Sequence, residues 1–162
     1  MKEIKLTQGK VALVDDEDYE YLNQFKWSFY KSRKTYYANR IKTIKGKGYG
    51  MTMHRVIMNT PSNMEVDHID HNGLNNQKHN LRNCTFTQNR KNKTASGKSK
   101  YLGVGFAGKQ IQAHILNLYL GSFKTEEDAA RAYDNAARKY HGEFANLNII
   151  KNGTRNSPQH NQ

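Results

Sequence analysis

The sequence is poor in cysteine and proline, with one and two respectively among 162 residues. A lone Cys84 excludes an intrachain disulfide and a thiolate-rich zinc site, and we expect it to be a small buried residue of a strand. No apolar run approaches the ~18 residues of a membrane-spanning helix, and the charged N-terminus is unlike a secretory leader. These features favour a cytoplasmic, nucleoid-associated protein with no membrane partner.

Acidic residues are also scarce, because 14 Asp and Glu accompany 26 Lys and Arg and leave a net charge of +12. Residues 51–89 are neutral, whereas residues 90–124 carry seven basic side chains and no acidic one. Clustered basic charge usually meets a polyanion, since neutralised phosphates release counterions. Ten tyrosines add ring faces and hydroxyls for such contacts. We expect double-stranded DNA as the partner, with RNA or a merely solubilising basic surface as the alternatives.

Residues 1–50 are predicted to be rich in β-structure. The segment Asp15–Asn23 is an exception, a short helix with acidic residues at its N-terminal end, and a helical turn is expected at His54–Met58. The region either braces the rest of the chain or adds DNA contacts through its basic residues. The predicted strands are Lys10–Val14, Lys26–Lys31 and Thr35–Lys42, the turn contains Gly46 and Gly48, and the basic residues are Arg33, Lys34, Arg40, Lys42, Lys45 and Lys47.

Two short strands and a brief helix are predicted between residues 64 and 89. The first strand carries Asp67 and His68, and Asn80-Leu81-Arg82 leads into the second. Thr85 or Thr87 caps the helix that bears Asn89. Oxygen ligands from Asp67 and Asn89 would suit Mg²⁺ or Mn²⁺. A metal-free His68 with a pKa near ~6.5 could act as a base at neutral pH. Neighbouring strand residues point to opposite sides, so a bend or bulge is expected to bring Asp67 and His68 together.

The elements His54-Arg55, Asp67-His68, Asn80-Leu81-Arg82 and Gln88-Asn89, in this order, resemble the HNH (ββα-metal) endonucleases of phage genomes and introns. The resemblance covers roughly residues 50–92. It implies that His68 is the general base, that Asp67 and Asn89 bind one divalent metal ion, and that Asn80 braces the loop holding the base. The third motif residue is Asn89 instead of His, as in the homing branch of the family.

Other polar residues near this motif receive no catalytic role from the sequence. His54 could orient the site, touch DNA or simply pack against its neighbours. The remaining asparagines are expected to be ordinary turn residues, and two further histidines are expected to be exposed in loops. These residues are Asn75, Asn76 and Asn83, and His71 and His79.

The stretch from Arg90 to Lys100 holds five positive charges and no apolar periodicity, which indicates a linker. It either lies along the DNA backbone or is a plain tether. A period-two pattern then predicts three antiparallel strands with one apolar face. A helix follows from its N-cap Thr125 to Gly142. Its packed face is expected to consist of Ala129, Ala132, Tyr133, Ala136 and Tyr140.

Four segments of this last region resemble the APETALA2/ethylene-response-factor DNA-binding domain over about residues 99–149. They are Ser99-Lys100-Tyr101-Leu102-Gly103-Val104, Tyr119-Leu120-Gly121-Ser122-Phe123, Glu127-Asp128-Ala129-Ala130-Arg131-Ala132-Tyr133-Asp134 and Gly142-Glu143-Phe144-Ala145-Asn146-Leu147-Asn148. The resemblance implies a sheet that reads the major groove. The first two strands carry Leu102, Gly105 and glutamines where the plant domains have arginines and a tryptophan, so a different target sequence is expected.

The sequence therefore predicts an α+β chain with a β-rich region at 1–50, a nuclease module at 51–92, a basic linker at 93–100, a DNA-binding domain at 101–149 and a disordered tail at 150–162. The predicted function is a site-directed, homing-type DNA endonuclease with one Mg²⁺ or Mn²⁺ per chain, monomeric or weakly dimeric, without an obligate protein partner. The alternative is a DNA-binding regulator with an inactive nuclease fold. The expected DNA contacts are Arg90, Lys91, Lys93, Lys98, Lys100, Tyr101, Lys109, Gln110, Gln112, His114 and Tyr119.

Overall fold

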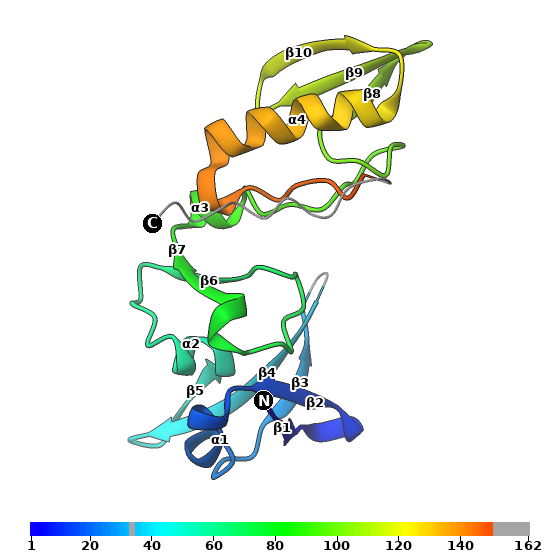
Figure 1. Cartoon of the computed structure of the whole chain (residues 1–162). Coiled ribbons are helices and arrows are strands. Elements are labelled where there is room, and N and C mark those ends of the chain that lie inside the picture. The colour runs from blue at the N-terminus through cyan, green and yellow to red at the C-terminus, as the bar shows by residue number, and fades with distance from the viewer. Residues whose placement is uncertain (33–34, 151–162) are drawn as a thin grey trace. The chain divides into compact units, whose positions relative to one another are not determined.

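Residues 1–32 and 35–150 are described by the computed structural model (Figure 1). They divide into unit 1, Met1–Asn89, and unit 2, which begins at Arg90. Arg33, Lys34 and the expected tail from residue 151 onward lie outside the described residues. Within the described part of the chain, no helix is both long and apolar enough to cross a membrane.

Unit 1 is built from small antiparallel sheets and short helices. The structure confirms three of the predicted strands, β2 (Val11–Val14), β3 (Ser28–Lys31) and β4 (Tyr36–Ile44), and both predicted helices, α1 (Asp16–Leu22) and α2 (Met53–Ile57). Two strands were missed. β1 (Lys2–Lys5) carries a single core residue among charged ones, and β5 (Lys47–Thr52) contains two glycines. The elements are β1 Lys2–Lys5, β2 Val11–Val14, α1 Asp16–Leu22, β3 Ser28–Lys31, β4 Tyr36–Ile44, β5 Lys47–Thr52, α2 Met53–Ile57, β6 Glu65–His68, β7 Leu81–Cys84 and α3 Phe86–Asn89.

One hydrophobic core joins the N-terminal strands to the segment that carries the motif. Trp27 lies at its centre, fully enclosed, and donates its Nε1–H to the carbonyl of Leu22 at 2.9 Å. Met53 from α2 is buried in the same cluster, and Leu74 from the loop after β6 packs against it. Residues 1–50 and the residues after position 50 therefore share one core, and neither part of unit 1 forms this core alone. The buried cluster consists of Ile4, Leu6, Ala12, Val14, Leu22, Trp27, Ala38 and Met53.

The predicted order of two strands and a helix is confirmed by β6, β7 and α3. The two strands pair antiparallel from Glu65 opposite Cys84 to His68 opposite Leu81. Thr85 begins the helix, since its Oγ1 accepts the backbone N–H of Gln88 at 3.2 Å. Cys84 is fully buried in β7, as expected, and burial, followed by the nearby carboxylates, raises its pKa to about 11. The thiol is therefore an inert part of the packing.

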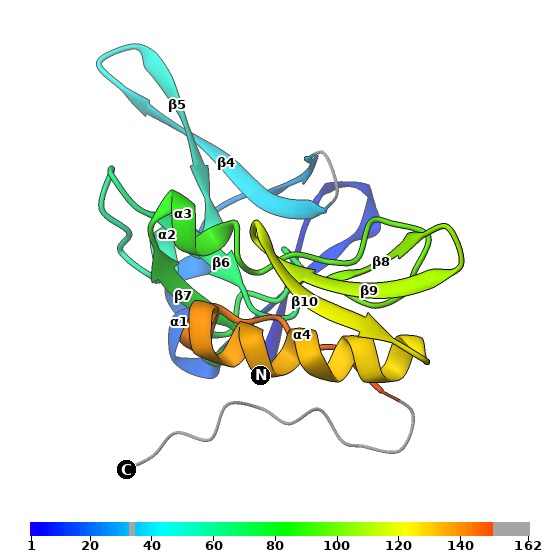
Figure 2. The same cartoon turned by 90° about the horizontal axis from the view of Figure 1, so that it is seen from above.

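In unit 2, a three-stranded antiparallel sheet packs one face against a helix, which confirms the predicted α+β arrangement. The helix runs along the sheet (Figures 1 and 2). Thr125 is its N-cap and accepts the backbone N–H of Asp128. Asn148 closes the unit by bonding both the backbone of Leu102 and the carboxylate of Asp134. The elements are β8 Val104–Ala107, β9 Gln110–Ile115, β10 Leu118–Phe123 and α4 Glu126–His141, in the sheet order β10-β9-β8.

The buried face of α4 differs from the predicted one. Ala130 and Ala137 are buried with Ala129 and Tyr133, while Ala132 and Ala136 are only partly buried and Tyr140 is 44% exposed. Alanines at adjacent positions allow two faces of the helix to lie close to a sheet, and only the packing selects between them. Tyr133 occupies the selected face and lies so close to Gly103 that a Cβ there would come within 1.9 Å of its ring.

Candidate functional site

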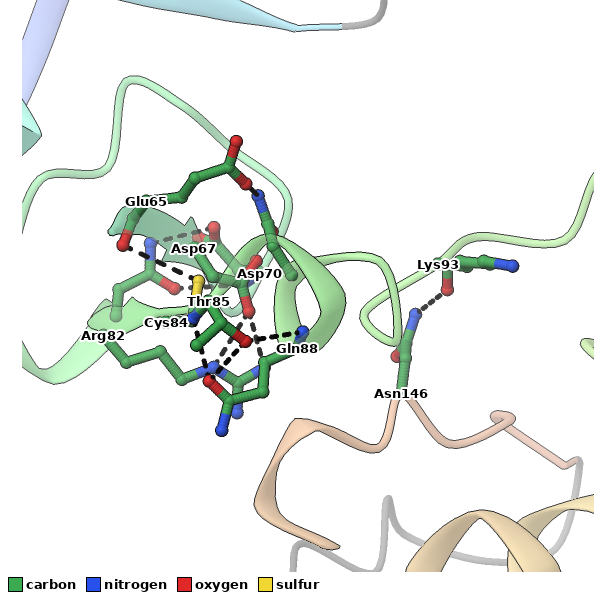
Figure 3. Close-up of polar contacts among 11 residues, drawn as sticks. Glu65, Asp67, Asp70, Arg82, Cys84, Thr85, Gln88, Lys93 and Asn146 are labelled. Carbon is green, nitrogen blue, oxygen red and sulfur yellow. Dashed lines mark hydrogen bonds and ion pairs between the residues drawn. The ribbon is translucent and has the colours of Figure 1, made fainter. Parts of the chain in front are cut away.

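Glu65 and Asp67 lie on the same face of β6, because they are two residues apart along a strand. Asp67 is 5% exposed, and the residue opposite it on β7 is Arg82. The Arg82 guanidinium donates to Asp67 Oδ2 from Nε at 2.9 Å and from Nη2 at 2.6 Å (Figure 3). One predicted metal ligand is therefore held by a half-buried cation from the neighbouring strand.

Asn89, the other predicted metal ligand, approaches the same face of β6 from α3. Its Nδ2 donates to Glu65 Oε2 at 2.6 Å. Glu65 was not among the sequence-predicted ligands, although its position two residues before Asp67 was a signal that could have identified it. The structure thus adds a second carboxylate to the side of β6 that carries Asp67.

His68 faces the opposite side of β6. The pairing of β6 with β7 shows no register shift from Glu65 to His68, so the predicted bend or bulge is absent from this ladder. The His68 ring contacts Tyr37, with centroids 5.7 Å apart, and meets His54 edge to face at 5.0 Å. The base and the carboxylates therefore point to different faces of one short strand.

The two hydrogen bonds of Asn76 identify which nitrogen of the His68 ring carries the proton. Asn76 is fully buried and donates Nδ2 to the Leu74 carbonyl at 3.2 Å, which turns its Oδ1 towards His68 Nε2 at 3.4 Å. With an acceptor at this distance, Nε2 carries the proton and the lone pair of a neutral ring lies on Nδ1. The expectation that Asn76 is an ordinary turn residue was therefore wrong.

The pKa of His68 is lowered from the ordinary imidazole value of ~6.5 that was predicted for it. Burial lowers it, and this outweighs the hydrogen bond that His68 donates to Asn76 and the charges of Asp70 and Asp67, which raise it. The pKa of His54 is lowered to about 3, by burial first and then by the charges of His68 and Arg55. Both imidazoles are consequently neutral at pH 7, and a neutral ring can accept a proton.

Asn80 ties together the loop that follows β6. Its Oδ1 accepts the backbone N–H of Asp70 at 3.0 Å, and its Nδ2 donates to Asp70 Oδ1 at 2.9 Å and to the Asn75 carbonyl at 2.8 Å. The backbone N–H of Ile69 bonds to the Asn80 carbonyl. Since this loop begins directly after His68, Asn80 controls the backbone path on the C-terminal side of the base.

The N-terminal strands hold the other side of this loop. Thr35 Oγ1 donates to the His71 carbonyl at 3.3 Å and accepts the Gly73 N–H at 3.2 Å. A Cβ on Gly73 would meet the Tyr36 carbonyl oxygen at 2.3 Å and the Tyr37 ring at 2.6 Å. His71 is half-buried here, in contrast to the expected exposed position, while His79 is exposed as expected.

Tyr37, from β4, is a residue near the site that the sequence did not reveal. Its ring lies against His54 as well as His68, with centroids 5.0 Å and 5.7 Å away. Burial raises the pKa of its hydroxyl, and the charges of Asp67 and Glu65 raise it further. Tyr37 therefore keeps its proton and lies against both histidines. No sequence pattern predicted the contacts of Tyr37 with the two histidines, because they depend on how β4 packs against β6.

The chemistry of the oxygen atoms on this side of β6 suits a hard cation. Asp67 and Glu65 supply carboxylates and Asn89 an amide oxygen, the ligand types preferred by Mg²⁺ and Mn²⁺. Within residues 1–32 and 35–150, no cluster of three or more His, Cys, Asp or Glu side chains has the geometry of a metal site. The Arg82 guanidinium instead supplies the positive charge beside Asp67.

In unit 2, the predicted DNA contacts fall into two groups. Gln110, His114 and Tyr119 are exposed on the sheet face away from α4, where Tyr119 touches His114 and bonds to Ser122. Tyr101 is 4% exposed, packs in the core and donates its hydroxyl to Glu127. A DNA contact through the Tyr101 ring is therefore not available in this structure. Of the remaining predicted contacts, Gln112 and Lys91 are half-buried, and Arg90, Lys93, Lys98, Lys100 and Lys109 are exposed.

The segment before this sheet is held to the C-terminal end of the unit at two points. Lys91 Nζ donates to the Tyr140 carbonyl at 3.4 Å, and Asn146 Nδ2 donates to the Lys93 carbonyl (Figure 3). Between Lys93 and Lys98 the chain is irregular and every residue is exposed. The basic side chains of this segment therefore face solvent along a stretch with few fixed contacts.

Comparison with known proteins identified one informative relative. The chain is 33% identical over 152 residues to an uncharacterized HNH endonuclease of Acanthamoeba polyphaga mimivirus, and the match covers 88% of this chain and 77% of the relative. No protein-family model matches the sequence. No solved structure matches it either.

Proposed function

This chain belongs to the HNH endonuclease family, and we propose that it is a metal-dependent endonuclease that hydrolyses phosphodiester bonds in double-stranded DNA. The observation that carries the proposal is the buried, neutral His68 at the end of β6, the strand that also carries Glu65, bonded to Asn89 of α3, and Asp67, bonded to Arg82 of β7. Such an arrangement pairs a base with hard oxygen ligands.

In the proposed mechanism, His68 accepts a proton from the attacking water at Nδ1, while Asn76 holds the Nε2 proton. Asn80 positions the base through the loop after β6. Asp67 and Asn89 would hold one Mg²⁺ or Mn²⁺, which when bound supplies positive charge to the phosphate and the leaving oxygen. One such site per chain cuts one strand, so a monomer would leave a nick at each binding event unless two chains assemble on the DNA.

We further propose that unit 2 is an APETALA2/ethylene-response-factor-like domain that targets the nuclease to its site, as in a homing endonuclease. The exposed sheet face supports this, because Gln110, Gln112 and His114 are side chains that hydrogen-bond base edges in the major groove. Lys109, at the turn between β8 and β9, is exposed beside them and can contact a phosphate.

A DNA-binding regulator with an inactive nuclease fold is the second candidate. One observation favours it: Asp67 is already neutralised by Arg82, and His68 points to the other face of β6. A regulator would retain the DNA contacts of both units without needing a metal ion.

A plasmid-cleavage assay separates the two candidates. Supercoiled plasmid is incubated with Mg²⁺ and the wild type, His68→Ala or His79→Ala, the last removing an exposed histidine of the same unit. The wild type and His79→Ala should nick the plasmid, and His68→Ala should be slower by at least ~100-fold, the usual contribution of a general base. If all three bind DNA and none nicks it, the regulator is the correct function.

A further inference from the structure

The β4–β5 hairpin extends beyond the core of unit 1. Every residue of its distal half, residues 41–50, is exposed, and this distal ribbon stands away from the rest of the unit (Figure 2). Ile41 is 72% exposed, and Ile44 and Tyr49 are about half exposed. Since a two-stranded ribbon gains little stability by itself in water, apolar side chains in this position indicate a binding surface.

The two faces of the distal ribbon differ in chemistry. Lys42 lies opposite Tyr49, and Ile44 lies opposite Lys47, so these four side chains share one face. The other face is mostly small, because Thr43 lies opposite Gly48 and Ile41 lies opposite Gly50. No acidic residue occurs between positions 36 and 52. The bulky face is therefore both basic and partly apolar.

Both edges of the distal ribbon expose backbone groups. β3 pairs only with the first part of β4, from Tyr36 to Asn39, and β5 is the edge strand of the sheet order β3-β4-β5. Outward-pointing N–H groups on such edges can donate to phosphate oxygens. Two strands ~5 Å apart, with their side chains, fit the ~12 Å width of a major groove, which admits a two-stranded ribbon.

The base of the ribbon is fixed to unit 1, which orients the exposed part. The Arg40 guanidinium carbon lies 3.7 Å from the Phe25 ring centroid and 5.4 Å from that of Trp27. Arg40, which the sequence placed among possible DNA contacts, therefore anchors the hairpin to the core. Lys45 and Gly46 form a two-residue turn with φ values of 48° and 77°, a conformation that matches the strand twist.

We propose that the distal ribbon inserts into the major groove of duplex DNA, with Lys42 and Lys47 on phosphates and with Ile44 and Tyr49 against base edges. The proposal rests on the proposed function, because it names a surface, distinct from β6, by which unit 1 binds the DNA that the nuclease cuts. Lys42 and Lys47, with no acidic residue between positions 36 and 52, give the ribbon the charge complementarity that favours a nucleic acid over a protein partner.

The first test measures affinity and its salt dependence in the cleavage-deficient His68→Ala protein. Lys42→Ala/Lys47→Ala is compared with Lys5→Ala/Lys26→Ala, which removes the same charge from exposed positions on other parts of unit 1. Fluorescence anisotropy with a mixed-sequence duplex of about 30 base pairs should show a loss of affinity of roughly tenfold or more, and a salt slope reduced by about two, for the ribbon variant alone. Equal losses in the two double variants, or no loss in either, would overturn the proposal.

The second test examines the groove. Methyl green, which occupies the major groove, should displace the parent protein more readily than Ile44→Ala/Tyr49→Ala, whereas netropsin in the minor groove should not distinguish them. Equal sensitivity to methyl green would overturn groove insertion. Lys42→Arg/Lys47→Arg should restore affinity if charge is the cause, and the melting temperature of each variant shows that unit 1 remains folded.

The cleavage assay keeps this inference apart from the proposed function. A wild type that never nicks DNA, together with a ribbon variant that binds weakly, would refute the nuclease and support the ribbon. A wild type that nicks DNA, together with ribbon variants that bind as the control does, would refute the ribbon alone.

Discussion

His54 and His68 meet edge to face, with ring centroids 5.0 Å apart and planes at 90°. One comes from α2 and the other ends β6, and Tyr37 contacts both rings. Neutral aromatic rings pack favourably in this geometry, whereas two imidazolium ions would repel each other. The pair therefore supports a neutral His68, the protonation state that a general base requires.

We predict that His54 makes unit 1 sensitive to acid. The pKa of His54 in the folded protein is about 3, whereas an unfolded histidine titrates near ~6.5. Between these values the unfolded state binds the additional proton, so stability rises with pH by up to ~1.4 kcal/mol per unit and levels off above ~6.5. Urea denaturation at a series of pH values from 4.5 to 7 gives the free energy of unfolding at each pH. This free energy should rise less steeply with pH for His54→Gln than for the wild type. His79→Gln is the control, and equal slopes for all three proteins would exclude His54 as the cause.

Asn80→Asp should destabilise unit 1 at neutral pH and recover partly on acidification. Asn80 Nδ2 donates to Asp70 Oδ1 at 2.9 Å, so the substitution replaces a donor by a second carboxylate. The lost hydrogen bond and the repulsion together cost ~1–3 kcal/mol, and the repulsion falls as one carboxyl group takes up a proton. The melting temperature at pH 5 and pH 8 measures both effects. Asn63→Asp, at an exposed position, should have nearly the melting temperature of the wild type. If Asn80→Asp melts at the same temperature as Asn63→Asp, Asn80 does not brace the loop after β6.

Arg82→Met should make the melting temperature more responsive to Mg²⁺. The substitution leaves the buried Asp67 carboxylate without the cation that now bonds it, at a cost of ~3 kcal/mol in metal-free buffer. A divalent cation should then stabilise the variant more than the wild type, in which Arg82 competes for the same oxygen. Thermal unfolding with EDTA and with Mg²⁺ gives the two shifts. Arg82→Lys, which keeps the charge, should respond as the wild type does. If Mg²⁺ changes the melting temperature of all three proteins by the same amount, Asp67 is not a metal ligand.

Gly73→Ala should destabilise unit 1 and slow cleavage. Its Cβ would meet the Tyr36 carbonyl oxygen at 2.3 Å and the Tyr37 ring at 2.6 Å, and overpacking of this kind costs ~1–3 kcal/mol. Because Tyr37 contacts His68, a displaced ring also disturbs the base. Gly50→Ala, whose Cβ would have an ordinary contact at 3.9 Å, is the matched control. Equal melting temperatures for the two variants would contradict the close packing, and a Gly73→Ala protein that nicks DNA as fast as the wild type would contradict the disturbance of the base.

Local sequence signals predicted much of the fold. The period-two pattern around Ile111, Ala113 and Ile115 predicted β9 because one face of this strand is buried and the other exposed. Thr125 and Gly142 predicted the ends of α4 because capping depends on residues near in sequence. β5 was missed because Gly48 and Gly50 weaken any strand pattern, and the face of α4 was misjudged because its alanines allow two alternatives.

The candidate site shows the same division. The sequence by itself determined that a strand ends in Asp67-His68, that Asn80 precedes the partner strand, and that Asn89 follows on a short helix, since these features are local in the chain. Only the tertiary structure decided that Arg82 neutralises Asp67, that Glu65 bonds Asn89, and that Tyr37 and His54 enclose His68. The physical reason is that side-chain pairing, burial and the resulting pKa values depend on which strands and helices pack together, and no local pattern encodes that packing.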